Sequence, residues 1–143
     1  MSVNTQTIGL KRNTIDKYYT NPYVVTKCIQ KIKQYISIQE NDLIIEPSAG
    51  NGSFINDLQG ISSNCLFYDL EPEHPSIVQQ DYLLLDTTSI SNTYSNIHVV
   101  GNPPFGRQSS LAIKFIKHSS KFANSISFIL PKSFKKDSMQ KHF

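Results

Sequence analysis

Short apolar runs alternate with amphipathic stretches along most of the chain. Each apolar run ends in acidic residues or in a turn rich in glycine, proline and polar residues, which is typical of short buried strands. Strands are predicted at residues 42–46, 65–72, 77–81, 97–104 and 125–134.

Apolar residues at helical spacing predict two amphipathic helices between these runs. In 24–37 the apolar stripe consists of Val25, Cys28, Ile29, Ile32, Tyr35 and Ile36. In 109–122 the corresponding face holds Leu111, Phe115 and Ile116. Residues 53–59 read as a short helix, and the polar stretch 86–96 as a surface loop or a frayed helix.

Buried strands that alternate with helices predict an α/β fold, a Rossmann-like doubly wound sheet that is mostly parallel with helices on both faces. A length of 143 residues fits one domain spanning 1–143, with 1–15 as a flexible N-terminal segment and no separate target-recognition domain. Ligands of such sheets bind at the carboxyl ends of the strands.

The net charge of +3 is distributed unevenly. Between Ser37 and Arg107 the chain has nine acidic residues and no lysine or arginine, whereas both flanks are basic. An ordinary solvated surface explains any single lysine. Segregation on this scale favours a polyanionic partner at the flanks and a small cationic ligand at the acidic middle.

Several classes of protein are excluded by what the sequence lacks. No apolar run approaches the length of a membrane span, and the N-terminus has no apolar signal-peptide core. Cys28 and Cys65 fit no metal or redox spacing, and the four histidines form no ligand cluster, so no metal is expected. Two lone cysteines without a signal peptide predict an intracellular protein, in the cytoplasm or the nucleus, with no membrane partner.

The segment EPSAGNGSF, residues 46–54, follows a predicted strand and opens a helix. Gly50 and Gly52 would allow a tight turn and a close approach of backbone to ligand. No Gly-Lys-Ser/Thr follows, and Ile55 stands where a dinucleotide-binding loop has its third glycine. A plain structural turn is the alternative to a loop that binds a positively charged ligand.

Acidic residues end the next two predicted strands. Asp69 lies about 20 residues after the glycine loop, where a doubly wound fold places a carboxylate on ribose hydroxyls. Asp81 could accept a hydrogen bond from an adenine amino group, with Tyr82 covering the ring. Each acid alone could be a solvated strand end; their succession favours a nucleoside-binding site.

The stretch VVGNPPFGRQ, residues 99–108, takes an apolar strand into Asn102, two prolines and Phe105. Consecutive prolines do not fit inside a helix or a central strand, because each lacks an N–H and has a fixed φ. The segment is either a simple strand terminus or a turn that holds an amide, a proline carbonyl and an aromatic ring around a ligand.

Together these segments resemble the class I S-adenosylmethionine-dependent amino-methyltransferases of the NPPF type, in particular the DNA adenine-N6 methyltransferases. EPSAGNGSF is similar to their cofactor loop, YDLEP to their ribose-binding strand end, QDYL to their adenine-binding segment and NPPF to their catalytic tetrapeptide. YYTNPYVV, residues 18–25, is similar to the N-terminal segment of the DNA-type branch. The resemblance runs from about Asp16 to Phe134.

The resemblance implies an enzyme that transfers a methyl group from S-adenosylmethionine to an exocyclic amino group, with N6 of adenine in DNA as the leading choice. The implied catalytic residues are Asn102, Pro103, Pro104 and Phe105. The implied cofactor-binding residues are Tyr19, Thr20, Glu46, Pro47, Ser48, Gly50, Gly52, Asp69, Leu70, Asp81, Tyr82 and Asn102. The basic C-terminal third would meet nucleic acid through Arg107, Lys132, Lys135 and Lys136.

Asn102 and the Pro103 carbonyl would accept the two amine hydrogens, and Phe105 would stack on the target ring. RNA adenine and protein glutamine remain alternative acceptors, because the tetrapeptide specifies a planar nitrogen rather than its polymer. A catalytically inactive module that binds nucleic acid or a partner is a further alternative. The family's usual strands beyond the fifth, and its target-recognition domain, have no counterpart in the sequence, so a partner subunit or a missing domain is expected to supply target recognition.

Overall fold

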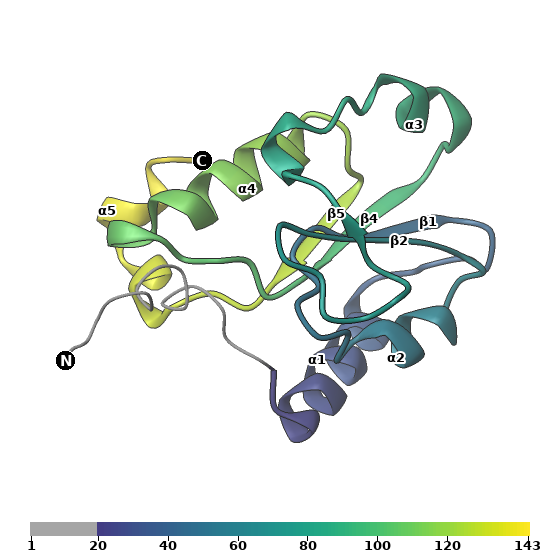
Figure 1. Cartoon of the computed structure of the whole chain (residues 1–143). Helices are drawn as coiled ribbons and strands as arrows, with labels where there is room; N and C mark the ends of the chain where they lie inside the picture. The colour runs from purple at the N-terminus through teal and green to yellow at the C-terminus, as the bar shows by residue number, and fades with distance from the viewer. Residues whose placement is uncertain (1–19) are drawn as a thin grey trace, which may run out of the picture.

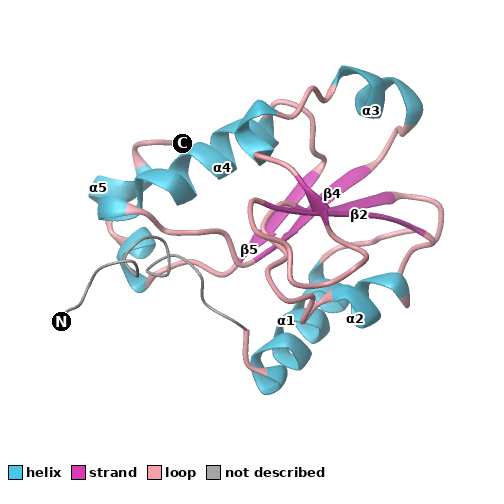
Figure 2. Ribbon diagram, in the orientation of Figure 1, coloured by secondary structure: helices cyan, strands magenta, loops and turns pink. Residues whose placement is uncertain are grey.

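The computed structural model describes residues 20–143, so the expected flexible segment 1–15 and Tyr19 lie outside the described residues. Five parallel strands form one sheet in the order β3-β2-β1-β4-β5, with helices packed on it (Figures 1 and 2). The strands are β1 Leu43–Glu46, β2 Asn64–Asp69, β3 Val78–Gln79, β4 Ile97–Gly101 and β5 Ser125–Phe128.

The α-helices are α1 Pro22–Tyr35, α2 Ile55–Gln59, α3 Thr88–Thr93, α4 Ser110–Ser120 and α5 Asp137–Gln140. α2, α3 and α4 lie in the connections between strands, α1 precedes β1 and α5 follows β5. The 3-10 turns are η2 Tyr82–Leu84, η3 Arg107–Ser109 and η4 Lys132–Lys135. Asn21 caps α1 by accepting a 2.8 Å hydrogen bond from the Tyr23 amide, with Pro22 at the first helical position.

β1 is the central strand and pairs with β2 on one side and β4 on the other, with Leu43 aligned to Asn64 and to Ile97. All four of its residues are buried. Because β2 and β3 extend the sheet in one direction and β4 and β5 in the other, the order of the strands reverses between β1 and β4. This is the topological switch point at which doubly wound folds bind ligands.

Alternate residues of β1 enter two separate cores, one on each face of the sheet. Ile44 packs with the buried side of α1 and α2, including Ile29 and Leu58. Leu43 and Ile45 pack with Tyr82 and the α4 residue Phe115 on the opposite face. The predicted doubly wound α/β fold with helices on both faces is therefore confirmed, and all its described strands are parallel.

The structure corrects several predicted boundaries and one predicted core residue. β2, β3, β4 and β5 are shorter than the runs 65–72, 77–81, 97–104 and 125–134, because the polar, glycine and proline residues at their carboxyl ends form loops. Residues 132–135 form η4 instead of strand. Tyr35 was expected in the buried stripe of the first helix, but it is 71% exposed, and Val25, Ile29 and Ile32 form the buried face.

A buried polar network joins β1, β4 and β5 at the amino edge of the sheet. His98 Nε2 lies 2.9 Å from Asp42 Oδ2, and His98 Nδ1 lies 2.7 Å from Ser125 Oγ. The Gln39 amide also donates to Asp42 Oδ2. Burial by itself would raise the pKa of Asp42, but the hydrogen bonds from Gln39 and His98 and the charge of His98 hold it below its usual value.

We expect His98→Phe to lower the free energy of unfolding at pH 7 by about 3 kcal/mol, because it removes the hydrogen bond and the charge of His98 from the buried Asp42 carboxylate. Because the pKa of Asp42 is lower in the folded state, its ionisation stabilises the fold at pH above its unfolded pKa of 3.8. This stabilisation is lost as the pH falls through the pKa of Asp42 in the folded state. The deficit should therefore shrink on acidification. Urea unfolding at pH 7 and below pH 4 measures both effects.

Ser125→Ala is the matched control, since it removes one neutral hydrogen bond and should cost only about 1 kcal/mol. Equal stability of His98→Phe and the parent at pH 7 would contradict a stabilising role for the network.

Candidate functional site

The residues that follow β1, β2 and β4 surround one cavity of about 280 Å³ at the carboxyl edge of the sheet. It lies beside the switch point between β1 and β4, where a ligand is expected in this fold. The lining residues are Pro47, Ser48, Gly50, Asp69, Leu70, Glu71, Gln80, Asp81, Tyr82, Leu83, Asn102, Pro104, Leu111 and Phe115.

The loop after β1 is held against the end of β2 by backbone hydrogen bonds. The Gly50 amide donates to Asp69 Oδ2 at 2.8 Å, and the Ala49 amide donates to the Tyr68 carbonyl at 2.8 Å. Gly50 and Gly52 adopt φ values of 60° and 88°, which glycine tolerates and other residues rarely adopt. The turn expected of these glycines is therefore present, and it brings backbone to the rim of the cavity.

Both predicted nucleoside-binding carboxylates face this cavity and already accept local hydrogen bonds. Asp69 Oδ1 accepts from the Glu71 amide at 2.8 Å, and Asp81 Oδ1 accepts from the Leu83 amide at 3.0 Å. These bonds fix the direction of each side chain. A carboxylate has about four acceptor positions, so each group can also receive a hydroxyl or an amino group of a ligand.

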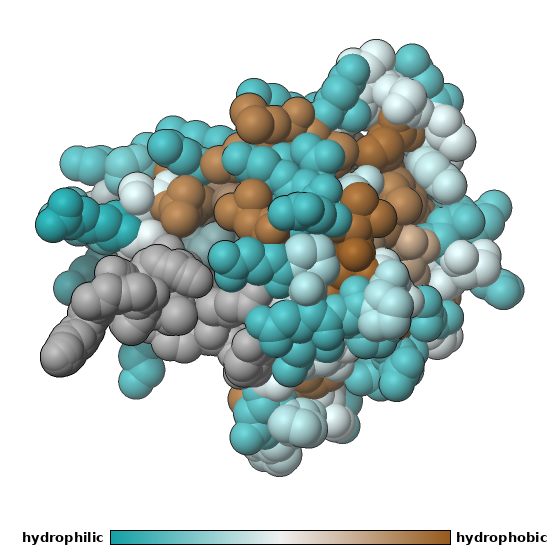
Figure 3. All heavy atoms as spheres, viewed as in Figure 1, coloured by the Kyte–Doolittle hydropathy of each residue, from teal (hydrophilic) through white to brown (hydrophobic). Residues whose placement is uncertain are grey.

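Apolar side chains form the walls between these two acids. Leu70 is 62% exposed although it is large and apolar, and Leu83, Leu111 and Phe115 line the cavity with it. Figure 3 shows apolar side chains gathered in the middle of the molecular face that Figure 1 presents, between α4 and the loops in front of the sheet. A cavity lined by two carboxylates and by apolar side chains suits a planar ring carrying polar edges.

Tyr82, predicted to cover an adenine ring, is only 1% exposed and belongs chiefly to the core. Its hydroxyl lies 2.6 Å from Ser119 Oγ, and its ring lies edge-on to His118. Leu70, Leu83 and Leu111 offer more accessible surface to a ligand ring than Tyr82 does. Leu83 and Leu111 were not among the predicted site residues, although Leu83 ends the segment QDYL and Leu111 lies three residues after the 99–108 stretch.

Glu46 ends β1 and is 2% exposed, and its Oε1 has no hydrogen-bond partner among the described residues. It lines a small hollow with Thr20 that adjoins the main cavity at Ser48, Gly50 and Asn102. Burial, and next the charge of Asp69, raise the pKa of Glu46 well above its usual value. An unpaired buried carboxyl at the edge of a cavity indicates a site for a cationic or hydrogen-bond-donating group.

Gly101 gives Glu46 the space it occupies. Its φ is 155°, and a Cβ added there would lie 3.1 Å from Glu46 Cγ. A side chain at this position would therefore press on the carboxyl that faces the hollow.

The predicted catalytic tetrapeptide begins at the same place. Asn102 lines both the cavity and the hollow, and its Nδ2 donates to Thr20 Oγ1 at 3.3 Å. The amide thus uses its NH₂ as a donor, which leaves its oxygen as the part that can accept from an amine. Pro104 lines the cavity, whereas Phe105 does not; the Phe105 carbonyl accepts from the Leu111 and Ala112 amides and fixes the loop to α4.

The basic residues predicted to bind nucleic acid do not line the cavity. Arg107, Lys132, Lys135 and Lys136 are exposed. The three lysines lie in and after η4, which is anchored by the buried Phe134. Their contact with nucleic acid remains a prediction.

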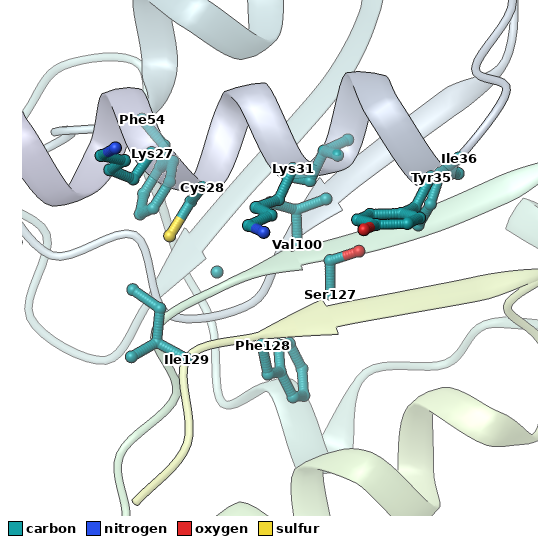
Figure 4. A pocket seen from close by; sticks show the side chains of 12 residues that line it. Lys27, Cys28, Lys31, Tyr35, Ile36, Phe54, Val100, Ser127, Phe128 and Ile129 are labelled. Carbon is teal, nitrogen blue, oxygen red and sulfur yellow. The ribbon is translucent and has the colours of Figure 1, made fainter.

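A second cavity, of about 360 Å³, lies between α1 and the ends of β4 and β5 (Figure 4). Its walls are mostly apolar, with Lys27, Lys31 and Tyr35 along the α1 side. It contains none of the predicted cofactor-binding or catalytic residues.

Within residues 20–143, no group of three or more histidine, cysteine, aspartate or glutamate side chains is placed to hold a metal ion. No helix in that part of the chain has the length and apolar character required to cross a membrane.

Comparisons with known proteins point to one functional class. No family model matches the sequence. The chain is 29% identical over 111 residues to "Ribosomal RNA small subunit methyltransferase A" of Francisella tularensis subsp. novicida (strain U112) and 28% identical to that of subsp. tularensis (strain SCHU S4 / Schu 4). Each match covers 68% of this chain and 42% of the relative, so the chain spans less than half the length of these relatives.

The fold is similar to the crystal structure of "a putative RNA methyltransferase PH1948 from Pyrococcus horikoshii". The TM-score is 0.62 at 14% sequence identity, and the match covers 92% of this chain and 74% of that chain. The likeness shows a shared Rossmann-like fold.

The structure predicts that Glu46→Gln stabilises the free protein. A raised carboxyl pKa means that the folded state holds a proton that the unfolded state has lost, so stability falls as pH rises above the ordinary value of 4.5. The glutamine variant lacks this penalty. Its Tm should equal that of the parent near pH 4 and exceed it increasingly toward pH 8, as measured by circular dichroism.

Glu40→Gln, at an exposed position, is the control and should leave Tm nearly unchanged at every pH. A Glu46→Gln variant that is less stable than the parent at pH 8 would show that the carboxyl is paired in solution.

Proposed function

We propose that this chain is the catalytic core of an S-adenosylmethionine-dependent methyltransferase that modifies the N6 amino group of adenine in RNA. The observation that carries the proposal is the buried Glu46 carboxyl, whose Oε1 has no hydrogen-bond partner within residues 20–143 and which lines the same hollow as Asn102. It places an acceptor for a cation next to an acceptor for an amine, at the end of a nucleoside-sized cavity.

The residues present fit the cofactor. Asp69 and Asp81 would accept from the ribose hydroxyls and the adenine amino group, while Leu70 and Leu83 would cover the ring. Glu46 would meet the ammonium end of the cofactor and become ionised there, because the positive charge would offset the burial that disfavours its charged form. When bound, S-adenosylmethionine would supply a methyl group made electrophilic by its sulfonium.

Asn102 and the Pro103 carbonyl would hold the acceptor amine. The lone pair of an adenine amino group is delocalised into the ring, so the amine is a weak nucleophile. Two acceptors on its hydrogens would direct the lone pair at the methyl group and stabilise positive charge as it develops on nitrogen. Thr20 would position the Asn102 amide through its hydrogen bond.

RNA replaces DNA as the favoured polymer. The sequence analysis chose DNA from the YYTNPYVV segment, whereas the relatives named above are described as ribosomal RNA methyltransferases and the structural neighbour as a putative RNA methyltransferase. These findings support the RNA alternative over the DNA expectation. A base within a duplex would have to be turned out to reach this pocket, so unpaired adenines are the natural acceptors.

The test uses the purified chain with isotopically labelled S-adenosylmethionine and separate pools of structured RNA, single-stranded DNA and duplex DNA. Mass spectrometry of the nucleosides should find label in N6-methylated adenosine from RNA. Asn102→Ala should lower the rate by about 10²–10³-fold, the usual cost of losing one oriented polar group. Cofactor affinity, measured by calorimetry, should change much less.

Asn56→Ala, at an exposed position of α2, is the matched control and should retain the parent rate. Label found in DNA alone would support DNA as the acceptor polymer. Cofactor binding without label in any pool would reject a nucleic-acid amine as the acceptor of this chain, and glutamine-containing peptides would be tested next. Absence of both cofactor binding and label would overturn the proposal that this chain is a methyltransferase.

A further inference from the structure

One exposed side of α1 has an ordered arrangement that neither the core nor the proposed cofactor site explains. Tyr23, Lys27, Lys31 and Tyr35 follow one another at intervals of four residues, and we call them the tyrosine–lysine stripe. Residues four apart are neighbours on a helix surface, so the stripe forms a continuous row. At 1.5 Å per residue it is about 18 Å long.

The core does not require these side chains. Tyr23 is 68% exposed and Tyr35 is 71% exposed, while the helix buries Val25, Ile29 and Ile32 instead. The stripe thus presents two large rings to solvent beside two ammonium groups. No acidic residue occurs anywhere in α1, so nothing within the helix neutralises its lysines.

Each lysine lies close to one of the rings. Lys27 Nζ is 5.4 Å from the centroid of Tyr23, and Lys31 Nζ is 5.8 Å from the centroid of Tyr35. The two pairs point in opposite senses along the helix, with the lysines in the middle and the rings at the ends. An aromatic face for a base next to a cation for a phosphate is the arrangement by which proteins bind single-stranded nucleic acid.

An apolar groove runs beside the stripe. Figure 4 shows Lys27, Lys31 and Tyr35 in succession along α1, with Ile129, Phe128 and Ser127 of the β5 region opposite them. The volume of about 360 Å³ gives room for a base turned away from the strand.

The stripe also begins next to the proposed acceptor pocket. Thr20, which bonds to Asn102, precedes Tyr23 by three residues. A strand whose adenine lies at Asn102 could therefore continue along α1, and about 18 Å accommodates several stacked nucleotides at roughly 3.4 Å each.

We propose that the tyrosine–lysine stripe binds the single-stranded RNA that adjoins the acceptor adenine, with bases on Tyr23 and Tyr35 and phosphates on Lys27 and Lys31. The choice of RNA rests on the proposed function. An extended peptide in the groove is the competing occupant; RNA is favoured because exposed tyrosine rings paired with cations match bases and phosphates, whereas a peptide in the groove would not need Tyr23.

The experiment measures binding of the full chain to a fluorescently labelled, unstructured RNA of about twelve nucleotides by anisotropy, without cofactor. Tyr23→Ala and Tyr35→Ala should each raise Kd about tenfold, the usual effect of losing one stacked base. Lys27→Gln and Lys31→Gln should each reduce the slope of log K against log salt by about 0.7, the value for one phosphate of a single strand.

Lys33→Gln is the matched control. Lys33 lies in the same helix but on the other flank of its buried face, where it lines a hollow with Ile38 and Ile61. It should leave both Kd and the salt slope close to the parent values. All five positions are exposed, and Tm of each variant checks that folding is preserved.

Two outcomes would overturn the proposal. One is parent-like RNA binding by the double variant Tyr23→Ala/Tyr35→Ala. The other is an equal loss of affinity in Lys33→Gln and Lys27→Gln, which would indicate diffuse charge instead of a defined strand path. Cofactor binding, measured separately by calorimetry without RNA, distinguishes these failures from failure of the proposed methyl transfer.

Discussion

The position at which β1 ends determines the rest of the site. β1 pairs with β2 and β4 in parallel, so the three strands finish at one edge of the sheet. That register brings Glu46, Asp69 and Asn102 together although they are far apart in the sequence. Since all of β1 is buried on both faces, a shift of its register would move apolar side chains out of two cores at once. The packing of β1 therefore fixes the positions of these three side chains.

This placement has an energetic cost that raises the pKa of Glu46 and that a bound cationic group would relieve. Among the described residues Glu46 Oε1 has no hydrogen-bond partner, and the charge of Asp69, another acid, adds to the effect of burial in raising the pKa of Glu46. Selection for stability alone would favour glutamine or an apolar residue at this position. A carboxyl kept here against that cost indicates a functional role, so Glu46 supports the proposed site more strongly than the partly buried Asp69 and Asp81 do.

Much of this could be predicted from the sequence, because buried strands of a parallel sheet read as short apolar runs and their polar carboxyl ends stand out. The burial of Glu46 could not be predicted, because it depends on the close approach of Gly101 from another strand. The Asp42–His98–Ser125 network could not be predicted from the sequence either, because its members are brought together only by strand pairing. Tyr35 failed as a core prediction for a different reason: its spacing fits the apolar stripe, but its ring turns to the surface beside Lys31.

Tyr35 lies on the surface beside Lys31 and not in the core, so its place in the structure bears on how the charged residues of the chain are interpreted. Four acids of the middle segment, Glu46, Asp69, Glu71 and Asp81, line the cavity and the hollow at the carboxyl edge of the sheet, and the described lysines of the basic N-terminal flank are exposed on α1. These two surfaces meet where Thr20 contacts Asn102. A cationic ligand would be attracted to the acids and repelled by the lysines of α1. A polyanion would be attracted to the lysines and repelled by the acids. Under the proposed function, the separation of charge along the chain would keep the cofactor and the RNA strand on different surfaces.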